Sequence, residues 1–158
     1  MSHPYKKQPA SAFWNTGVAE PAMHDVDPLD SFPFRIGATD KVATAGSCFA
    51  QQIARRLSEA GFTYLVTETG HPLASAEVRR TFQYGVYSAR YGNIYYARQL
   101  LQLFQEAFET PQEPMEVWAY KDRFVDPFRP IVEPDGFFNA EEVRQDRAQN
   151  LGHVRTML

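Results

Sequence analysis

A glycine turn between an apolar run and an amphipathic run constrains the fold of this chain most. Residues 41–46, KVATAG, are apolar and end at glycine, as in a buried strand that enters a tight turn. Apolar residues then recur at intervals of four from 49 to 57, which predicts an amphipathic helix that ends near Gly61. Residues 62–68, FTYLVTE, favour a second strand. A strand, a helix and a strand in this order predict a mainly parallel sheet of the α/β class.

The second half of the chain predicts two further helices and a hairpin. Apolar residues at intervals of three and four indicate a helix over 94–108, with Asn93 as its N-cap. Aromatic and β-branched residues alternate with turn residues over 116–134, which is typical of a short hairpin. A capping-box pattern at Asn139 predicts a last helix that runs to residue 158.

The chain divides into an arm and one domain. Residues 1–37 are rich in Pro, Gly, Asp and His without sustained periodicity, so we expect an extended arm that lies over the core or is partly disordered. Residues 38–158 form the expected α/β domain, and 44% hydrophobic residues suffice for one core. The apolar face of the last helix reaches residue 158 without a stop signal. We therefore expect a domain truncated at its C-terminus, or a homodimer through this helix.

Composition limits the classes of partner that the chain is expected to bind. The net charge is −3 and Lys and Arg are scattered, which argues against binding to nucleic acid or an anionic membrane surface. No apolar run approaches the roughly 20 residues of a membrane span, and the first residues do not resemble a signal peptide. We expect a cytoplasmic protein with a small-molecule substrate. A single cysteine without His or Cys at zinc spacing predicts no disulfide, no metal and no cofactor.

The glycine turn also carries chemistry. It places Ser47 and Cys48 over the N-terminus of the following helix, where unpaired N–H groups and a partial positive charge stabilise anions. This field favours the reactive thiolate of Cys48, whereas a Ser47 nucleophile needs a positioned base. The structural alternative makes Ser47 an ordinary helix cap and Cys48 a small buried hydrophobe. The residues alone leave both alternatives open.

Three segments carry a resemblance to a known family. They are GSCFA at 46–50, SARYGNIYYARQLLQL at 88–103 and DPFRPIVEPDGF at 126–137. Together they resemble the GSCFA family from about residue 31 to the end of the chain. That family is distantly similar to the SGNH or GDSL-type esterases and acyltransferases. The resemblance implies a partial flavodoxin-like, SGNH-hydrolase-like fold: three layers, α/β/α, around a mainly parallel sheet.

The resemblance also implies roles for the turn and for a later loop. Matched to the Gly-Asp-Ser turn of SGNH enzymes, Gly46 takes the place of the glycine and Cys48 that of the nucleophilic serine. A shift by one residue gives the nucleophile role to Ser47. Gly92 is the candidate for the later oxyanion-hole glycine, and Asn93 either donates beside it or caps the helix. A turn glycine with positive φ is the alternative for Gly92.

Further residues of these segments are candidates for contact with substrate. Gly46 lies at the turn itself, and the guanidinium groups of Arg90 and Arg129 suit a carboxylate or a phosphate. Salt bridges are the alternative for both arginines. Trp118 and Tyr120 alternate on the predicted hairpin and favour either an aromatic wall for the substrate or core packing.

A general base is missing from this pattern. SGNH enzymes carry an Asp-x-x-His, and this chain has none. His71 follows the second predicted strand and is a weak candidate for the base. GSCFA proteins continue past the point where this chain stops, which implies that the base lies beyond residue 158. We therefore expect a hydrolase or acyltransferase that acts on an ester or acyl group, such as a carbohydrate ester, and is weak or inactive alone. The alternative is a non-catalytic binding module of the same fold.

Overall fold

The computed structural model describes residues 3–27, 32–109 and 115–158. The chain forms two compact units, Met1–Ile36 and Gly37–Leu158. In the described residues, no helix is long and apolar enough to cross a membrane.

The smaller unit consists of short helical turns. They are η1 (Ala10–Ala12), η2 (Asn15–Ala19) and η3 (Met23–Asp25). The Thr16 hydroxyl donates a hydrogen bond to the Ala10 carbonyl at 2.7 Å, which ties the second turn to the first. The segment that we expected to be extended therefore contains local helical turns. Its predicted docking over the core stays a prediction.

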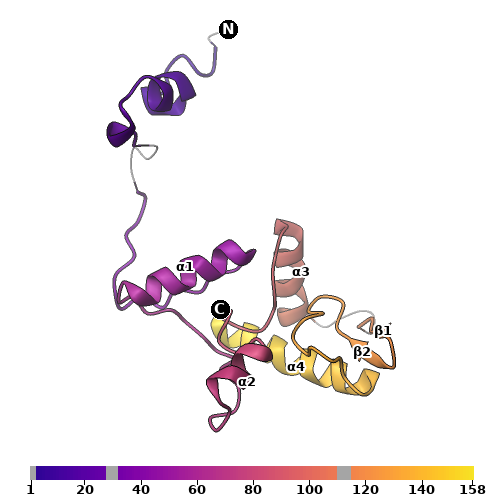
Figure 1. The fold of residues 1–158 in the computed structure, drawn as a ribbon. Helices are drawn as coiled ribbons and strands as arrows, with labels where there is room; N and C mark the ends of the chain where they lie inside the picture. Colours follow the sequence, from indigo (N-terminus) through magenta and orange to yellow (C-terminus); the bar gives the residue numbers. More distant parts are fainter. Residues whose placement is uncertain (1–2, 28–31, 110–114) are drawn as a thin grey trace. The chain divides into compact units, whose positions relative to one another are not determined.

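The helix predicted after the glycine turn is present as α1 (Cys48–Glu59), labelled in Figure 1. Its buried residues are Ala50 and Ala54, whereas Phe49 and Ile53 remain exposed. The small alanines let the helix backbone approach the rest of the unit closely, so the large apolar side chains turn outward. Sequence periodicity identified the helix but not its buried side.

The two predicted strands around α1 are reduced to a single bridge. Residues 41–46 and 62–68 meet in one parallel bridge, Val42–Tyr64. It is formed by hydrogen bonds from Val42 N to Thr63 O at 3.0 Å and from Leu65 N to Val42 O at 2.9 Å. The parallel direction of this bridge is the predicted one. Within the described residues, however, the mainly parallel sheet is not shown.

A third segment takes the hydrogen bonds that would extend this bridge. Thr44 N donates to the Ser88 hydroxyl at 3.2 Å, and Thr67 N donates to the Ser88 carbonyl at 2.7 Å. Because a side chain replaces a backbone partner on one side, no regular ladder forms. Ser88 thus holds both predicted strands without adding a strand of its own.

The next two helices are α2 (Ala76–Thr81) and α3 (Ala97–Phe108). The prediction that Asn93 caps the second of them is wrong, because α3 begins later and its N-cap is Tyr96. The N–H of Ile94 donates to the Gly46 carbonyl at 2.8 Å. This bond holds the preceding loop against the glycine turn and delays the start of the helix.

The predicted hairpin and last helix are confirmed. Strands β1 (Trp118–Tyr120) and β2 (Arg123–Val125) pair antiparallel, and this is the two-stranded sheet of the described residues. Helix α4 (Ala140–Met157) begins at Asn139, whose side-chain oxygen accepts a hydrogen bond from Glu142 N at 2.9 Å. Figure 1 shows α4 beside β2 and α3, and both contacts are close.

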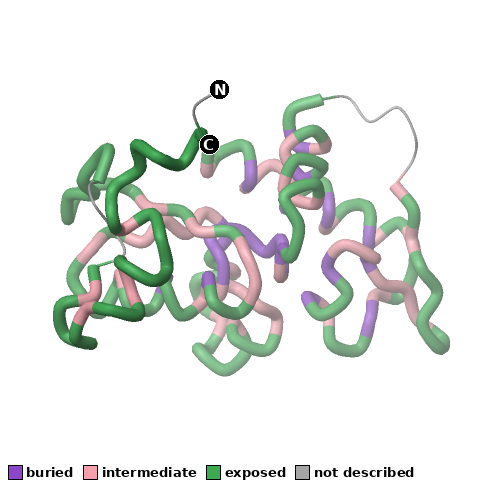
Figure 2. The backbone as a smooth tube through the Cα atoms, turned by 90° about the horizontal axis from the view of Figure 1, so that it is seen from above, coloured by how far each residue is buried: buried purple, intermediate pink, exposed green. Residues whose placement is uncertain are grey.

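The core lies where the segment before α3 meets α3 and α4. Its buried residues are Tyr87, Ala89, Tyr91, Ile94, Leu103, Ala107 and Val154. Figure 2 shows how few segments of the larger unit are buried. Leu151 and Met157 of α4 pack against the same core. The apolar face that suggested a homodimer is therefore covered largely within the chain, and it gives a dimer no support.

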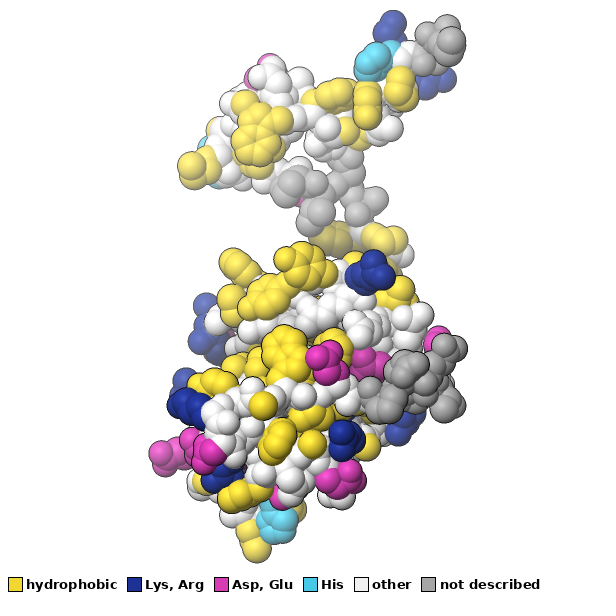
Figure 3. Space-filling view, turned by 90° about the vertical axis from the view of Figure 1, so that its right-hand side faces the viewer, with side chains coloured by type: hydrophobic (Ala, Val, Ile, Leu, Met, Phe, Trp, Pro, Cys, Tyr) yellow, Lys and Arg dark blue, Asp and Glu magenta, His cyan; other side chains and the backbone are white. Residues whose placement is uncertain are grey.

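The surface of the larger unit mixes both charges. In the space-filling view of Figure 3, basic and acidic side chains are interspersed among apolar ones. The side chains coloured on this face form no continuous basic patch.

Candidate functional site

The two candidate nucleophiles at the glycine turn differ, because Cys48 is exposed whereas Ser47 caps the helix. Ser47 is the N-cap of α1, and its hydroxyl accepts a hydrogen bond from Phe49 N at 3.4 Å. Cys48 is the first residue of the helix and is exposed. The cap alternative for Ser47 is confirmed, whereas the alternative of a buried Cys48 is wrong. A Cβ on Gly46 would lie 3.2 Å from the Ala50 Cβ, so glycine permits the close turn.

The loop with Gly92 and Asn93 lies against this turn. The hydrogen bond from Ile94 N to Gly46 O joins the two segments directly. Gly92 is buried and has a φ of +74°, which favours glycine and agrees with the turn alternative. Among the described residues, none accepts a hydrogen bond from the backbone N–H of Gly92. This donor is therefore unpaired within the described residues.

The side chain of Asn93 is held by two residues that sequence reasoning missed. Its Oδ1 accepts hydrogen bonds from the Gln51 amide at 3.3 Å and from the Tyr87 hydroxyl at 3.2 Å. The Gln51 amide also donates to the Tyr87 hydroxyl at 2.8 Å. With Oδ1 fixed, the Asn93 amide nitrogen makes no hydrogen bond to a described residue, so it is free to donate to a ligand.

Burial shifts the titration of the Tyr87 hydroxyl to higher pH. Desolvation raises the pKa of Tyr87, while the hydrogen bond from Gln51 lowers it less. A neutral hydroxyl remains a donor to Asn93. Gln51 lies one helical turn after Ser47, so its spacing in the sequence could have placed it near the turn. Nothing in the sequence pointed to Tyr87.

A cavity of about 310 Å³ opens beside this loop. Gly92 and Asn93 lie at its wall. The complete lining is Gly92, Asn93, Tyr95, Gln99, Pro127, Phe128, Arg129, Pro130 and Ile131. The cavity therefore joins two of the three segments that carry the family resemblance.

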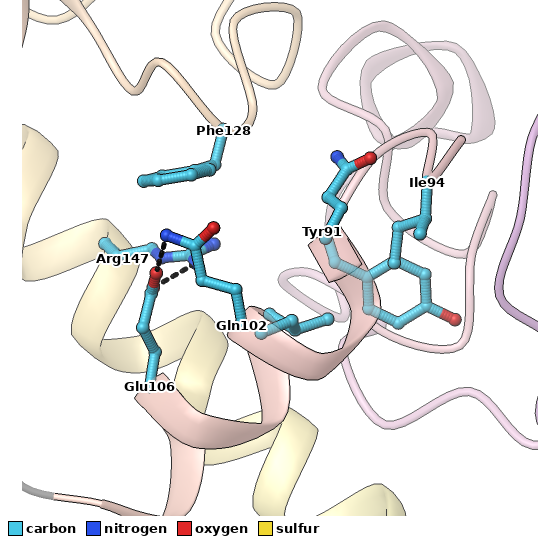
Figure 4. Close-up of a pocket in the computed structure, with 8 residues that line it drawn as sticks. Tyr91, Ile94, Gln102, Glu106, Phe128 and Arg147 are labelled. Carbon is cyan, nitrogen blue, oxygen red and sulfur yellow. Dashed lines mark hydrogen bonds and ion pairs between the residues drawn. The ribbon is translucent and has the colours of Figure 1, made fainter. Parts of the chain in front are cut away.

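A second cavity lies nearby but is too small for a substrate. Figure 4 shows its lining, with the Phe128 ring above Arg147 and with Gln102 and Arg147 both bonded to Glu106. Its volume is about 10 Å³, which holds one water molecule at most.

Arg90 and Arg129 lie in a buried network of charges. Arg90 donates to Glu68 at 3.4 Å and to Asp146 at 3.1 Å, while Arg129 donates to Asp126 and Asp146 at 2.7 Å each. Both arginines are almost completely buried.

Their remaining guanidinium nitrogens bind carbonyl groups. Arg90 Nε donates to Phe82 O at 2.9 Å and Nη2 to Val132 O at 3.0 Å, while Arg129 Nη1 donates to Arg90 O at 3.5 Å. Every guanidinium nitrogen is thus engaged within the protein. This arrangement favours a structural role for both arginines over the predicted contact with substrate.

His71 lies in an exposed loop before α2. Its Nδ1 accepts a hydrogen bond from Leu73 N at 3.2 Å. In the part of the chain that the structure describes, no hydrogen bond joins the imidazole to Ser47 or Cys48. The prediction of His71 as base gains no support from these contacts. The same described residues contain no cluster of three or more His, Cys, Asp or Glu side chains arranged to hold a metal.

The aromatic residues of the hairpin lie apart from the cavity beside Gly92. Trp118 and Tyr120 are about half exposed, so the core-packing alternative is wrong. Neither residue lines that cavity.

Comparison with known proteins places the chain in a family. The model of the GSCFA family matches residues 41–158, which include the turn, the Gly92 loop and the last helix. No curated protein and no solved structure matches the chain.

Proposed function

The chain belongs to the GSCFA family, and on that premise we propose that it carries the nucleophile and oxyanion donors of an SGNH-like hydrolase or acyltransferase. The substrate is an ester, and Cys48 attacks its carbonyl carbon. In the same proposal, the Val42–Tyr64 bridge and the adjacent Ser88 segment belong to a flavodoxin-like sheet.

The observation that carries the proposal is the different use of the two side chains at the turn. The Ser47 hydroxyl is engaged in capping, whereas the Cys48 thiol is exposed at the positive end of α1. The partial positive charge at this end of the helix stabilises negative charge that develops near it during the reaction. Cys48 is therefore the preferred nucleophile, and Ser47 holds the helix start in place.

The Gly92 loop supplies the donors for the negative charge that develops on the carbonyl oxygen. The free backbone N–H of Gly92 and the free amide nitrogen of Asn93 both belong to the loop that Ile94 ties to Gly46. Preorganised donors of this kind lower the barrier to acyl transfer because they need no reorganisation during the reaction.

The reaction proceeds in two steps. The thiolate of Cys48 forms a C–S bond to the carbonyl carbon, the C–O bond of the ester breaks, and the alkoxide leaves and takes a proton from water. The thioester then transfers its acyl group to water or to an alcohol, and the thiolate is regenerated. Without a positioned base the leaving group must be a good one, so an activated ester is the suitable probe.

Intact-protein mass spectrometry after treatment with p-nitrophenyl acetate tests this proposal. We expect one acetyl group on the wild-type chain, none on Cys48→Ala, and one on Ser47→Ala. Peptide mapping locates the group. Acetylation that survives in Cys48→Ala but not in Ser47→Ala would transfer the nucleophile role to Ser47.

The position of His71 favours a second candidate, a non-catalytic binding module. The imidazole accepts a hydrogen bond within its own loop, and no hydrogen bond joins it to Ser47 or Cys48 in the part of the chain that the structure describes. In a module of this kind the exposed thiol acquires no acetyl group faster than free cysteine does. An ester analogue that cannot be cleaved would still bind beside Gly92.

A further inference from the structure

We propose that the cavity beside Gly92 and Asn93 binds the aliphatic acyl chain of the substrate, with the ester carbonyl at its polar end. The inference rests on the proposed function and adds the class of substrate to it. The group that occupies this cavity is a neutral chain of a few methylenes, and not a sugar or a carboxylate.

The walls of the cavity are largely apolar. The lining includes the apolar residues Pro127, Phe128, Pro130 and Ile131 and the aromatic residue Tyr95. Ile131 is 49% exposed and also lines a neighbouring cavity of about 490 Å³. A ligand that covers these side chains removes apolar surface from water, which is the main source of affinity in such sites.

Two polar side chains of the lining, Gln99 and Arg129, are already engaged within the protein. Gln99 accepts a hydrogen bond from Tyr95 N at 3.0 Å and donates to Asn93 O at 3.1 Å, so both ends of its amide are used. The Arg129 guanidinium binds Asp126, Asp146 and the Arg90 carbonyl. Most hydroxyl groups of a sugar would lose hydrogen bonds to water with few free partners to replace them, and a carboxylate would find no free cation in this lining.

Two donors of the lining residues have no partner among the described residues. They are the Gly92 N–H and the Asn93 amide nitrogen, and in this proposal both donate to the ester carbonyl oxygen. A volume of about 310 Å³ lies at the lower end of the range for small-ligand sites. It fits a short or medium acyl chain. Each methylene buried there increases binding by up to about fourfold.

Kinetics with p-nitrophenyl esters from acetate to octanoate test the inference on the full chain. We expect kcat/KM to rise with chain length in the wild type. Ile131→Trp adds bulk to the lining, so its ratio of octanoate to acetate cleavage should fall at least tenfold. Leu73→Trp, on a loop outside the cavity, is the matched control and should keep the wild-type ratio. A flat chain-length profile, or equal ratios in both variants, would overturn the inference.

Binding of hexanamide, measured by calorimetry, separates the inference from the proposed function. We expect wild type and Cys48→Ala to bind it equally, Ile131→Trp at least tenfold more weakly, and methyl glucoside not to compete. Hexanamide binding without acetylation of Cys48 would refute the nucleophile and leave the cavity assignment standing. Ester cleavage without hexanamide binding, or competition by methyl glucoside, would refute the cavity assignment.

Discussion

The hydroxyl of Tyr87 determines which way the Asn93 amide faces. It accepts a hydrogen bond from Gln51 and donates to Asn93 Oδ1, which leaves the Asn93 amide nitrogen free. Tyr87→Phe removes one of the two donors that hold Asn93. We expect kcat for p-nitrophenyl acetate to fall about tenfold to a hundredfold, with a small change in KM, because the loss affects an interaction of the transition state.

Tyr64→Phe is the control for this substitution. The Tyr64 hydroxyl lies 3.4 Å from the Thr44 hydroxyl and makes no contact with Asn93. Its removal should leave kcat unchanged. Equal losses of kcat in the two variants would mean that Tyr87 acts through general stability and does not position Asn93.

The Tyr91 hydroxyl makes the free energy of unfolding depend on pH in the alkaline range. Burial raises the pKa of Tyr91 from 10.0 to about 12, and its hydroxyl donates to the Thr44 carbonyl. Because the folded state holds this proton more tightly, its contribution is fully present below pH 10 and is lost as pH rises to about 12.

Urea unfolding of the wild type and Tyr91→Phe at pH 8 and pH 11 measures this contribution. At pH 8 we expect Tyr91→Phe to be less stable by about 1 kcal/mol, since Thr44 O loses its donor. At pH 11 the difference should shrink. A difference that stays constant across this range would contradict the buried, protonated hydroxyl.

Among the elements, α4 has the best-defined start. Asn139 accepts from Glu142 N at 2.9 Å, and the Glu142 carboxylate accepts from Phe138 N at 3.0 Å, one residue before the N–H that a regular capping box binds. Asn139→Ala should lower the free energy of unfolding by about 1 kcal/mol. Gln149→Ala, at an exposed position of the same helix, should change it by less than about 0.5 kcal/mol. Equal effects of both substitutions would argue against the cap.

The helices were predictable because their signals are local. Capping at Ser47 and Asn139 and the periodicity after each of them depend on neighbouring residues alone. The parallel sheet was not predictable in the same way. Residues 41–46 and 62–68 have strand-forming composition, but the Ser88 side chain takes the place of a ladder partner. A hydrogen bond between residues 44 positions apart leaves no trace in local composition.

On the scale of the whole larger unit, Asp146 joins segments that are distant in sequence. Its two carboxylate oxygens accept from Arg90 at 3.1 Å and from Arg129 at 2.7 Å. Asp146→Ala leaves two buried guanidinium groups short of a partner, so we expect a loss of about 3 kcal/mol in the free energy of unfolding. Asp122→Ala, at an exposed turn, is the control and should have little effect. A loss below about 1 kcal/mol in Asp146→Ala would refute the structural role of the network.

The candidate site was partly predictable on the same scale. The resemblance suggested Cys48, Gly92 and Asn93, whose roles stay predictions, and the structure joins their segments through the Gly46–Ile94 hydrogen bond. The buried ion pairs of Arg90 and Arg129 favour a structural role for them, and a sequence does not reveal that buried carboxylates already occupy a guanidinium group. Side-chain partners that depend on three-dimensional packing are beyond the reach of motif spacing.

The exposed Cys48 thiol as nucleophile is the central claim, and the rate of its acylation tests it most directly. The full chain and Asn93→Ala are treated with p-nitrophenyl acetate, and acetylated Cys48 is followed by mass spectrometry against free cysteine at the same pH. We predict that Cys48 in the wild type reacts at least tenfold faster than free cysteine, and that Asn93→Ala removes most of this advantage. A Cys48 that reacts no faster than free cysteine, with no effect of Asn93→Ala, would contradict the claim.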